Sequence, residues 1–344
     1  EVLTARMPGG LAQVNILLST LMGGLSGSSL ADAAMQCKML VPTMESKGYS
    51  KSFSTVITAA SGMVVPLIPP GVGLIIYGCI NNISIGKLFI AGIGPGIVLC
   101  VTLMIFTHFL SKKRGYLPSR TTKIPVSEKI AAVKPAFLPL LLPIIIIGGV
   151  RIGIFTASEA GTVAIVYAVL LGLLYKELTL KNVMQGCKET VTTTASIMLI
   201  VAAATCFSWI LTKEQIPQQF SQWMISNIHN KYVFLIMVNI FLLIVGMFIE
   251  GNASMIVLAP LLHPVAMAYG IDDIHFAMVY IFNCTIGAFT PPMGTLMFVS
   301  CGITKCPTKD FIKEAVPFYI LFAIDIIVLT YIPQLTTFLV NVFY

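Results

Sequence analysis

The sequence predicts an all-α protein that crosses a membrane several times. Of its 344 residues, 57% are hydrophobic and only 10% are charged, whereas soluble domains average about 45–50% apolar and about 25% charged residues. The apolar residues form long segments separated by short polar loops. Because a helix needs about 20 such residues to cross a bilayer, the chain has room for several crossings.

The stretch 24–32, GLSGSSLAD, separates two apolar segments, 11–22 and 30–41, each too short to cross a bilayer alone. Two half-length segments around a polar tip predict a re-entrant helical hairpin. A membrane tolerates such irregular backbone only where it is buried in protein or lines a cavity. The tip is therefore a candidate binding site.

The next helix, 52–80, contains the proline-rich break PLIPPG at 66–71. Adjacent prolines remove backbone donors and clash with the preceding turn, so this helix is predicted to be broken inside the membrane. The chain then continues with predicted spans at 85–110, 136–150, 155–175 and 190–211, a surface helix at 176–188, an interfacial segment at 216–228, second hairpin arms at 232–249 and 255–268, a second broken helix at 275–303 and a last span at 317–342.

The two halves of the chain match at one fixed offset, the one that takes Gly24 to Gly246. Glycines and prolines carry the match, and these residues decide where helices bend or end. At the same offset, Pro42 matches Pro264, Pro69 and Pro70 match Pro291 and Pro292, and Pro95 matches Pro317. We therefore predict two transport-domain repeats, 1–95 and 231–316, with scaffold-type spans at 96–230 and a final span at 317–344.

Basic residues predict the orientation. The loop 111–135 carries seven Lys/Arg and one acidic residue, which is typical of a cytoplasmic loop. Counting crossings from it places sixteen Lys/Arg inside and four outside, and gives the second repeat an inverted topology. Inverted repeats are typical of secondary transporters, whose sites lie at the repeat interface. The net charge of +7 thus reports topology, and no nucleic-acid partner is predicted.

The hairpin tips and proline breaks offer free carbonyls, amides and hydroxyls. Carbonyl and hydroxyl oxygens suit a hard monovalent cation, while helix N-termini suit a substrate carboxylate. We expect two cation sites, one for each hairpin and break. The residues assigned to cations are Ser26, Gly27, Ser28, Ser61, Gly62, Pro66, Gly251, Asn252, Asn283, Thr290, Gly294 and Thr295, and those assigned to the substrate are Ser28, Ser29, Asp32, Pro69, Pro70, Glu250, Asn252 and Ser254.

Each assignment has a structural alternative. A Ser or Thr hydroxyl in a membrane helix often bonds back to its own helix or to a neighbour. Asp32 and Glu250 favour a functional role, because carboxylates inside a membrane are costly. Asp325 and Glu159 fit a helix contact equally well, and a structural role is favoured for Lys38. No metal-ligand spacing, catalytic triad or phosphate-binding loop occurs in the sequence, so neither an enzyme nor ATP-driven transport is predicted.

Four motifs resemble the large membrane subunit of tripartite ATP-independent periplasmic (TRAP) transporters. They are GLSGSSLAD at 24–32, IPPG at 68–71, GIFTASEA at 153–160 and TPPMG at 290–294. The resemblance implies an elevator-type secondary transporter of the ion transporter superfamily type in a bacterial inner membrane. It places Ser26, Ser28, Asp32, Glu250 and Asn252 where the family's cation and substrate contacts lie. It also implies further helices before Glu1.

The resemblance implies sodium-coupled uptake of an organic acid, with sodium as the coupling ion and no cofactor. It also implies a small four-helix membrane subunit, a soluble periplasmic binding protein and lipid as partners. Overall similarity favours sialic acid as the substrate, and a C4-dicarboxylate or another organic acid is the alternative. A dicarboxylate or citrate carrier that needs no binding protein, and an ion channel with a filter of broken helices, remain as further hypotheses.

Overall fold

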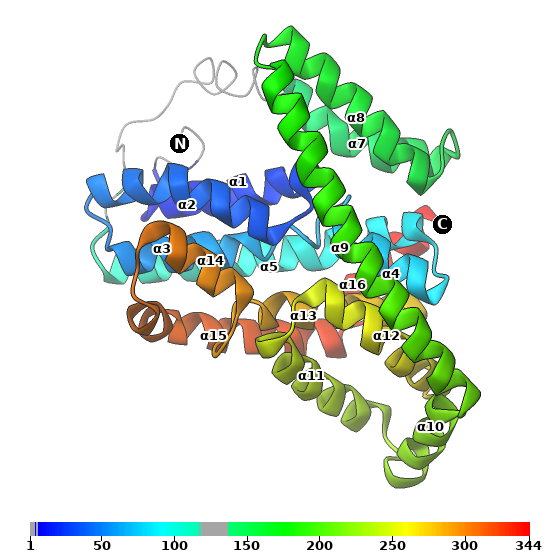
Figure 1. The fold of residues 1–344 in the computed structure, drawn as a ribbon. Coiled ribbons are helices and arrows are strands. Elements are labelled where there is room, and N and C mark those ends of the chain that lie inside the picture. The colour runs from blue at the N-terminus through cyan, green and yellow to red at the C-terminus, as the bar shows by residue number, and fades with distance from the viewer. Residues whose placement is uncertain (1–3, 5, 117, 119–136) are drawn as a thin grey trace.

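The computed structural model describes residues 4, 6–116, 118 and 137–344, and every regular element among them is a helix (Figure 1). The first half contains α1 (Gly10–Ser26), α2 (Ser29–Ser46), α3 (Lys51–Gly62), α4 (Val72–Asn81) and α5 (Ile85–Lys113). The middle contains α7 (Phe137–Ile152), α8 (Ala157–Leu174), α9 (Leu180–Lys213) and α10 (Ile216–Asn227). The second half contains α11 (Lys231–Phe248), α12 (Gly251–Ala268), α13 (Asp273–Gly287), α14 (Thr295–Thr304), α15 (Thr308–Tyr331) and α16 (Gln334–Phe343).

Several of these helices are suited to a membrane. Four described helices, α5, α9, α11 and α12, are long and apolar enough to cross a bilayer. The α15 and α16 pair, bent by 49°, is a possible fifth. The prediction of an all-helical protein with several membrane-spanning helices is confirmed. Most of the basic loop predicted at 111–135 lies outside the described residues, and the orientation stays a prediction.

The two halves have the same order of helices at the offset that the sequence suggests. Both ends of α2 match both ends of α12 at this offset, and the first residue of α3 matches the first residue of α13. The Pro69–Pro70 and Pro291–Pro292 peptide bonds are both cis. The halves also interlock, because α2 packs against α14 of the other half and α12 packs against α4.

Short polar residues set the helix starts. Ser28 precedes α2, and its hydroxyl accepts a hydrogen bond from the backbone N–H of Ala31. Glu250 precedes α12, and its carboxylate accepts from the N–H of Ala253 at 3.1 Å. These caps satisfy backbone donors that the first helical turn leaves free. Each cap lies within a tip, so the local sequence defines where the chain turns.

Three predicted elements differ from the structure. The arms around the first tip are longer than expected, at 17 and 18 residues, because the helix continues through two glycines until Gly27 adopts φ 59°. The surface helix and span predicted at 176–188 and 190–211 are joined from Leu180 onward in one continuous helix of 34 residues, α9, since no proline lies between them. The final span is divided, because α15 ends at Tyr331 and Pro333 precedes α16.

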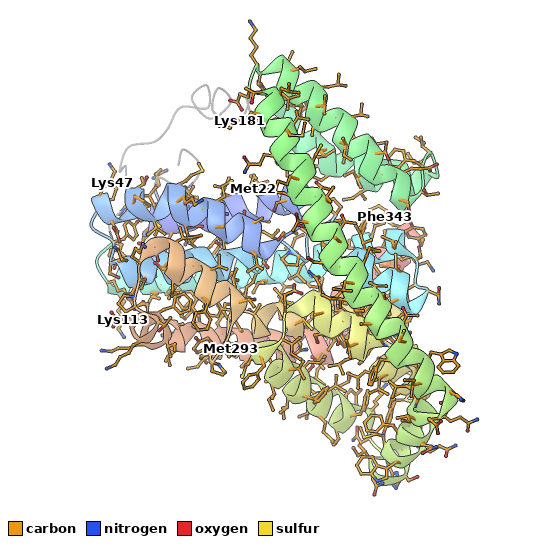
Figure 2. All side chains as sticks on the ribbon, in the orientation of Figure 1. Met22, Lys47, Lys113, Lys181, Met293 and Phe343 are labelled. Carbon is orange, nitrogen blue, oxygen red and sulfur yellow. The ribbon has the colours of Figure 1, made fainter. Side chains whose placement is uncertain are left out.

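The two halves form the packed body of the molecule, whereas the middle helices lie largely outside it. In Figure 1, α9 crosses the front of the molecule diagonally, and α7 and α8 lie at its upper edge. Most side chains of α8 and α9 are exposed in the isolated chain. Lys47 and Lys113 both lie at one end of the body (Figure 2). There Arg114 forms an ion pair with Glu314 and lies 5.1 Å from the Phe53 ring centre.

Two of the predicted segment boundaries fall inside helices. The helix α5 continues through the boundary at 95/96, and α15 continues through the one at 316/317. Pro95 and Pro317 both lie within these helices rather than at their ends. The division into repeats and scaffold stays a prediction.

Candidate cation and substrate sites at the helix tips and proline breaks

The first tip, residues 26–29, lies directly against the first break, residues 63–71. The backbone N–H of Val72 donates to Gly27 O at 3.3 Å. A Cβ atom on Gly27 would lie 2.7 Å from Pro70 O, so only glycine allows this approach at φ 59°. The structure therefore brings the predicted residues Gly27 and Pro70 together.

Asp32 lies inside the first helix pair rather than on the surface of its tip. Its side chain is 1% exposed. Its Oδ2 accepts from Ser19 Oγ at 2.7 Å and from Gln36 Nε2 at 2.7 Å. Its Oδ1 is buried without a hydrogen-bond partner, as is Ser26 Oγ at the tip. The first half thus holds a carboxylate oxygen and a hydroxyl oxygen that are both free to bind a cation.

Ser19 connects this carboxylate to Ser61, near the end of α3. Ser19 Oγ lies 3.0 Å from Ser61 Oγ as well as bonding Asp32. Next to Ser61, Gly62 faces the start of α2, because a Cβ on it would lie 3.3 Å from Ser29 O and 3.8 Å from Asp32 Oδ2. The predicted residues Ser29, Asp32, Ser61 and Gly62 therefore form one neighbourhood.

The end of α11, just before the second tip (residues 249–252), lies against the second break, residues 288–294. The backbone N–H of Met293 donates to Met247 O at 3.2 Å, and the Met293 side chain is 56% exposed (Figure 2). The two oxygens of Glu250 are both engaged, one with Asn252 Nδ2 at 2.8 Å and the other with the N–H of Ala253. Glu250 thus has an observed capping role, unlike Asp32.

Behind the second tip lie two further predicted residues, Ser254 and Asn283. The Ser254 hydroxyl is buried beside Tyr280 OH at 3.3 Å and Cys284 Sγ at 3.9 Å. Asn283 donates from Nδ2 to Asn239 Oδ1 at 2.8 Å, while its Oδ1 is buried without a partner. The second half therefore offers a free amide oxygen where the first half offers a carboxylate.

The remaining predicted residues have less distinctive surroundings. The hydroxyl of Thr290 donates to Ile286 O at 2.8 Å, which is the helix back-bonding that the sequence left open. Ser28 caps α2, Thr295 begins α14, and Gly294 precedes it. Within the described residues, no hydrogen bond outside the helices involves Pro66, Pro69 or Gly251, and none joins the first tip to the second.

Three other charged residues have structural surroundings. Glu159 forms a capping box with Thr156 at the start of α8. Asp325 is buried and accepts from Thr102 Oγ1 at 2.9 Å, which connects α15 to α5. Lys38 is exposed on α2. Each of these observations favours the structural alternative.

The sequence interpretation overlooked several polar residues that lie around the predicted ones. They are buried amides and hydroxyls on helices, and no tip or break motif marks them. Their only sequence signal is a polar residue within an apolar helix, which membrane packing also uses. They are Asn15, Ser19, Gln36, Thr58, Asn239 and Thr330.

The oxygens described above suit a hard cation. Hydroxyl, amide, carbonyl and carboxylate oxygens are the ligands that such cations prefer. In the part of the chain that the structure describes, no three His, Cys, Asp or Glu side chains are grouped to hold a metal ion. A cation between tip and break would therefore depend on neutral oxygens, with Asp32 as the one nearby carboxylate in the first half.

Comparison with known proteins identifies the family. The profile of the family described as the tripartite ATP-independent periplasmic transporter, DctM component, matches residues 2–335. The chain belongs to this family. The sialic acid TRAP transporter large permease protein SiaM of Vibrio cholerae is 40% identical over 342 residues, covering 99% of this chain and 80% of that protein.

Two further relatives have other lengths or substrates. The sialic acid TRAP transporter permease protein SiaT of Haemophilus influenzae is 36% identical, covering 97% of this chain and 54% of that protein. The C4-dicarboxylate TRAP transporter large permease protein DctM of Pseudomonas aeruginosa is also 36% identical, covering 97% of this chain and 78% of that protein. The chain is therefore a TRAP transporter permease of the inner membrane and not an enzyme.

Proposed function

We propose that this TRAP permease drives sodium-coupled import of an organic anion. The observation that carries the proposal is a contact between each helix pair and a proline break. Gly27 at the first tip meets Val72, and Met247 at the end of α11 meets Met293. Beside each pair lie buried oxygens without hydrogen-bond partners: Ser26 Oγ and Asp32 Oδ1 in the first half, and Asn283 Oδ1 in the second. Oxygens of this kind suit a monovalent coupling ion.

We further propose that the two halves are inverted repeats with re-entrant hairpins, and that they move together as an elevator. The common helix bounds and the reciprocal packing of α2 with α14 and α12 with α4 support this arrangement. Helix length does not separate a re-entrant pair from two spans, since α11 and α12 are each long enough to cross. The proposed mobile unit is 1–95 with 231–316, and 96–230 contributes scaffold spans.

The coupling ions and the substrate would occupy different parts of the tips. Asp32 is enclosed by α1, α2 and α3, and its negative charge would repel an organic anion, so we assign it to the cation. The anion would bind nearer the N-termini of α2 and α12, where Ser28, Ser29 and Asn252 lie and the helix dipoles favour a carboxylate. Glu250, held by its capping bonds, would then shape the second tip.

Sialic acid is the first substrate to test, because the relative that is 40% identical carries that name. A C4-dicarboxylate is the second candidate, since DctM of Pseudomonas aeruginosa is 36% identical. We also propose that the permease works with a small membrane subunit and a periplasmic substrate-binding protein. The tripartite, periplasmic description of its family supports this.

The test is uptake into proteoliposomes that contain this permease and its small subunit. Radiolabelled sialic acid or succinate would be offered with the binding protein and an inward sodium gradient each present or absent. We expect uptake that needs both. Uptake without the binding protein would indicate an autonomous carrier, and uptake without sodium would contradict the coupling.

A further inference from the structure

We propose that Asn15 of α1 and Asn239 of α11 are positioning residues for the two coupling-ion sites. In each half, this asparagine orients a predicted cation ligand, Ser61 in the first half and Asn283 in the second, so that an oxygen of the ligand is free to bind the ion. The inference rests on the proposed function, because it assigns new residues to the same two sites. Asn15 and Asn239 lie on α1 and α11, the helices that lead into the first and second tips.

In the first half, hydrogen-bond accounting fixes the orientation of the Asn15 amide. The Thr58 hydroxyl donates its one proton to Ser54 O at 2.8 Å. Thr58 Oγ1 must therefore accept from Asn15, and the atom 2.6 Å away is Asn15 Nδ2. The amide oxygen of Asn15 is then left to face Ser61.

This orientation decides what Ser61 can do. Ser61 Oγ lies 3.0 Å from Asn15 Oδ1 and 2.9 Å from Thr58 O. Both of these atoms only accept hydrogen bonds, so the one Ser61 proton is donated to one or the other of them. The Ser61 oxygen therefore keeps lone pairs for Ser19, which lies 3.0 Å away, or for a cation.

In the second half, a backbone carbonyl and the Asn239 side chain together fix the orientation of the Asn283 amide. Asn283 lies 2.8 Å from Val279 O and 2.8 Å from Asn239 Oδ1, and both contacts involve its Nδ2. Neither oxygen can donate, so the Asn283 nitrogen, which carries two protons, is held between Val279 O and Asn239 Oδ1. Asn239 is oriented in turn, because its Nδ2 donates to Thr330 Oγ1 at 2.9 Å. The remaining atom, Asn283 Oδ1, is buried and has no partner.

The two halves show independently that a buried asparagine orients a proposed cation ligand. Ser61 and Asn283 occupy matching positions at the repeat offset, but Asn15 and Asn239 do not, since Leu17 matches Asn239. All four of these polar side chains are almost fully buried. The residue after each proposed ligand lies near the start of the helix that follows the tip. Gly62 lies near Ser29 at the start of α2, and Cys284 lies near Gly251 at the start of α12.

Polar side chains between membrane helices also act simply as packing contacts, and the experiment must separate that role from ligand positioning. Sodium-activated uptake would be measured in the complete transporter across a range of sodium concentrations. The variants are N15L and N239L, which remove the amides, and T58V and T330V, which remove only the groups that orient them. Thr58→Ser and Thr330→Ser retain the hydroxyls, and T192V on the exposed face of α9 is the control.

We expect each of the four disruptive variants to raise the half-saturating sodium concentration about 2- to 10-fold, the effect of losing one hydrogen bond. The maximal rate at saturating sodium should stay unchanged. The two serine variants and T192V should keep the wild-type sodium dependence. Sodium-induced thermal stabilisation of the purified permease gives a second readout, and its midpoint should shift by the same factor.

A variant that lowers the maximal rate or the stability without sodium, while its half-saturating sodium concentration stays unchanged, would show packing alone and overturn the inference. The variants S61A and N283L remove the proposed ligands themselves. They separate a failure of the cation sites from a failure of the positioning role. If they weaken sodium activation and the asparagine variants do not, the inference fails and the proposed function stands. If wild-type uptake ignores sodium, both fail.

Discussion

The first and second halves of this permease have the same framework but different charge at matching positions. Asp32 in α2 and Ser254 in α12 match at the repeat offset and lie one turn inside their helices. Asp32 is enclosed by Ser19 and Gln36, whereas Ser254 lies beside Tyr280 and Cys284. The two halves thus share their helix positions, but the interior residue is a carboxylate in the first half and a hydroxyl in the second.

The two proposed sites therefore need not bind an ion in the same way. A carboxylate compensates the charge of a buried cation directly, whereas a neutral site depends on oriented dipoles. The first half has the free oxygen of Asp32, and the second has the free amide oxygen of Asn283. We therefore expect the first half to be more sensitive to loss of its central side chain.

The largest expected effect tests the charge in the first half. Asp32→Asn keeps the size of the side chain but removes its negative charge, so sodium-driven uptake should fall at least about 100-fold, as when one member of a buried ion pair is lost. Glu45→Gln, at the other end of α2, where Glu45 pairs with Lys51 at 3.6 Å, is the control and should retain uptake. Normal uptake by a folded Asp32→Asn protein would show that the charge of Asp32 is not needed for transport.

A smaller effect tests the difference between the two tips. Gly27 has φ 59°, and the position that matches it, Ile249, has φ −118°. Gly27→Ala should lower the free energy of unfolding by about 1–2 kcal/mol, because alanine resists the left-handed region and its Cβ would meet Pro70 O. Ile249→Ala, which changes an exposed side chain, should change stability by about 0.5 kcal/mol or less. Thermal unfolding in detergent would measure both, and equal shifts would contradict the comparison.

The smallest expected effect concerns the neutral interior of the second half. Ser254→Ala removes a hydroxyl whose contacts with Tyr280 and Cys284 are long. We expect the free energy of sodium binding to weaken by about 0.5–1.5 kcal/mol, which raises the half-saturating sodium concentration by at most about 10-fold. Sodium titration of uptake beside Asp32→Asn would check this. A Ser254→Ala defect as large as that of Asp32→Asn would mean that the two halves are equally sensitive after all.

Much of the fold could be predicted from residues with strong local effects. The prolines at 69–70 and 291–292 interrupt helices wherever they occur, and α3, α4, α13 and α14 begin and end close to the predicted positions. Weaker signals misled the prediction. The polar residues near 188–190 do not divide α9, because charged residues are compatible with a helix. Pro317 is accommodated within α15, while Pro333 precedes α16.

The candidate site was predictable in its motifs but not in its partners. Glycine and serine at the first tip mark a turn in any context, and Asp32 within apolar sequence marks a costly charge. The hydrogen-bond partners around the candidate site come from distant positions in the chain. Asn15 contacts Ser61, and Asn239 contacts Thr330. Nothing local to Asn239 indicates that it holds Asn283, 44 residues away.

The helical fold, the membrane segments and the breaks at two matching pairs of prolines could all be predicted from the sequence, because hydropathy and proline act locally along the chain. The TRAP family also follows from the sequence. The folded molecule was needed to show that α2 packs against α14, that Asp32 lies enclosed, and which way the amides of Asn15 and Asn283 are oriented. These features depend on which donors and acceptors meet when distant helices pack, and no short stretch of sequence contains that information.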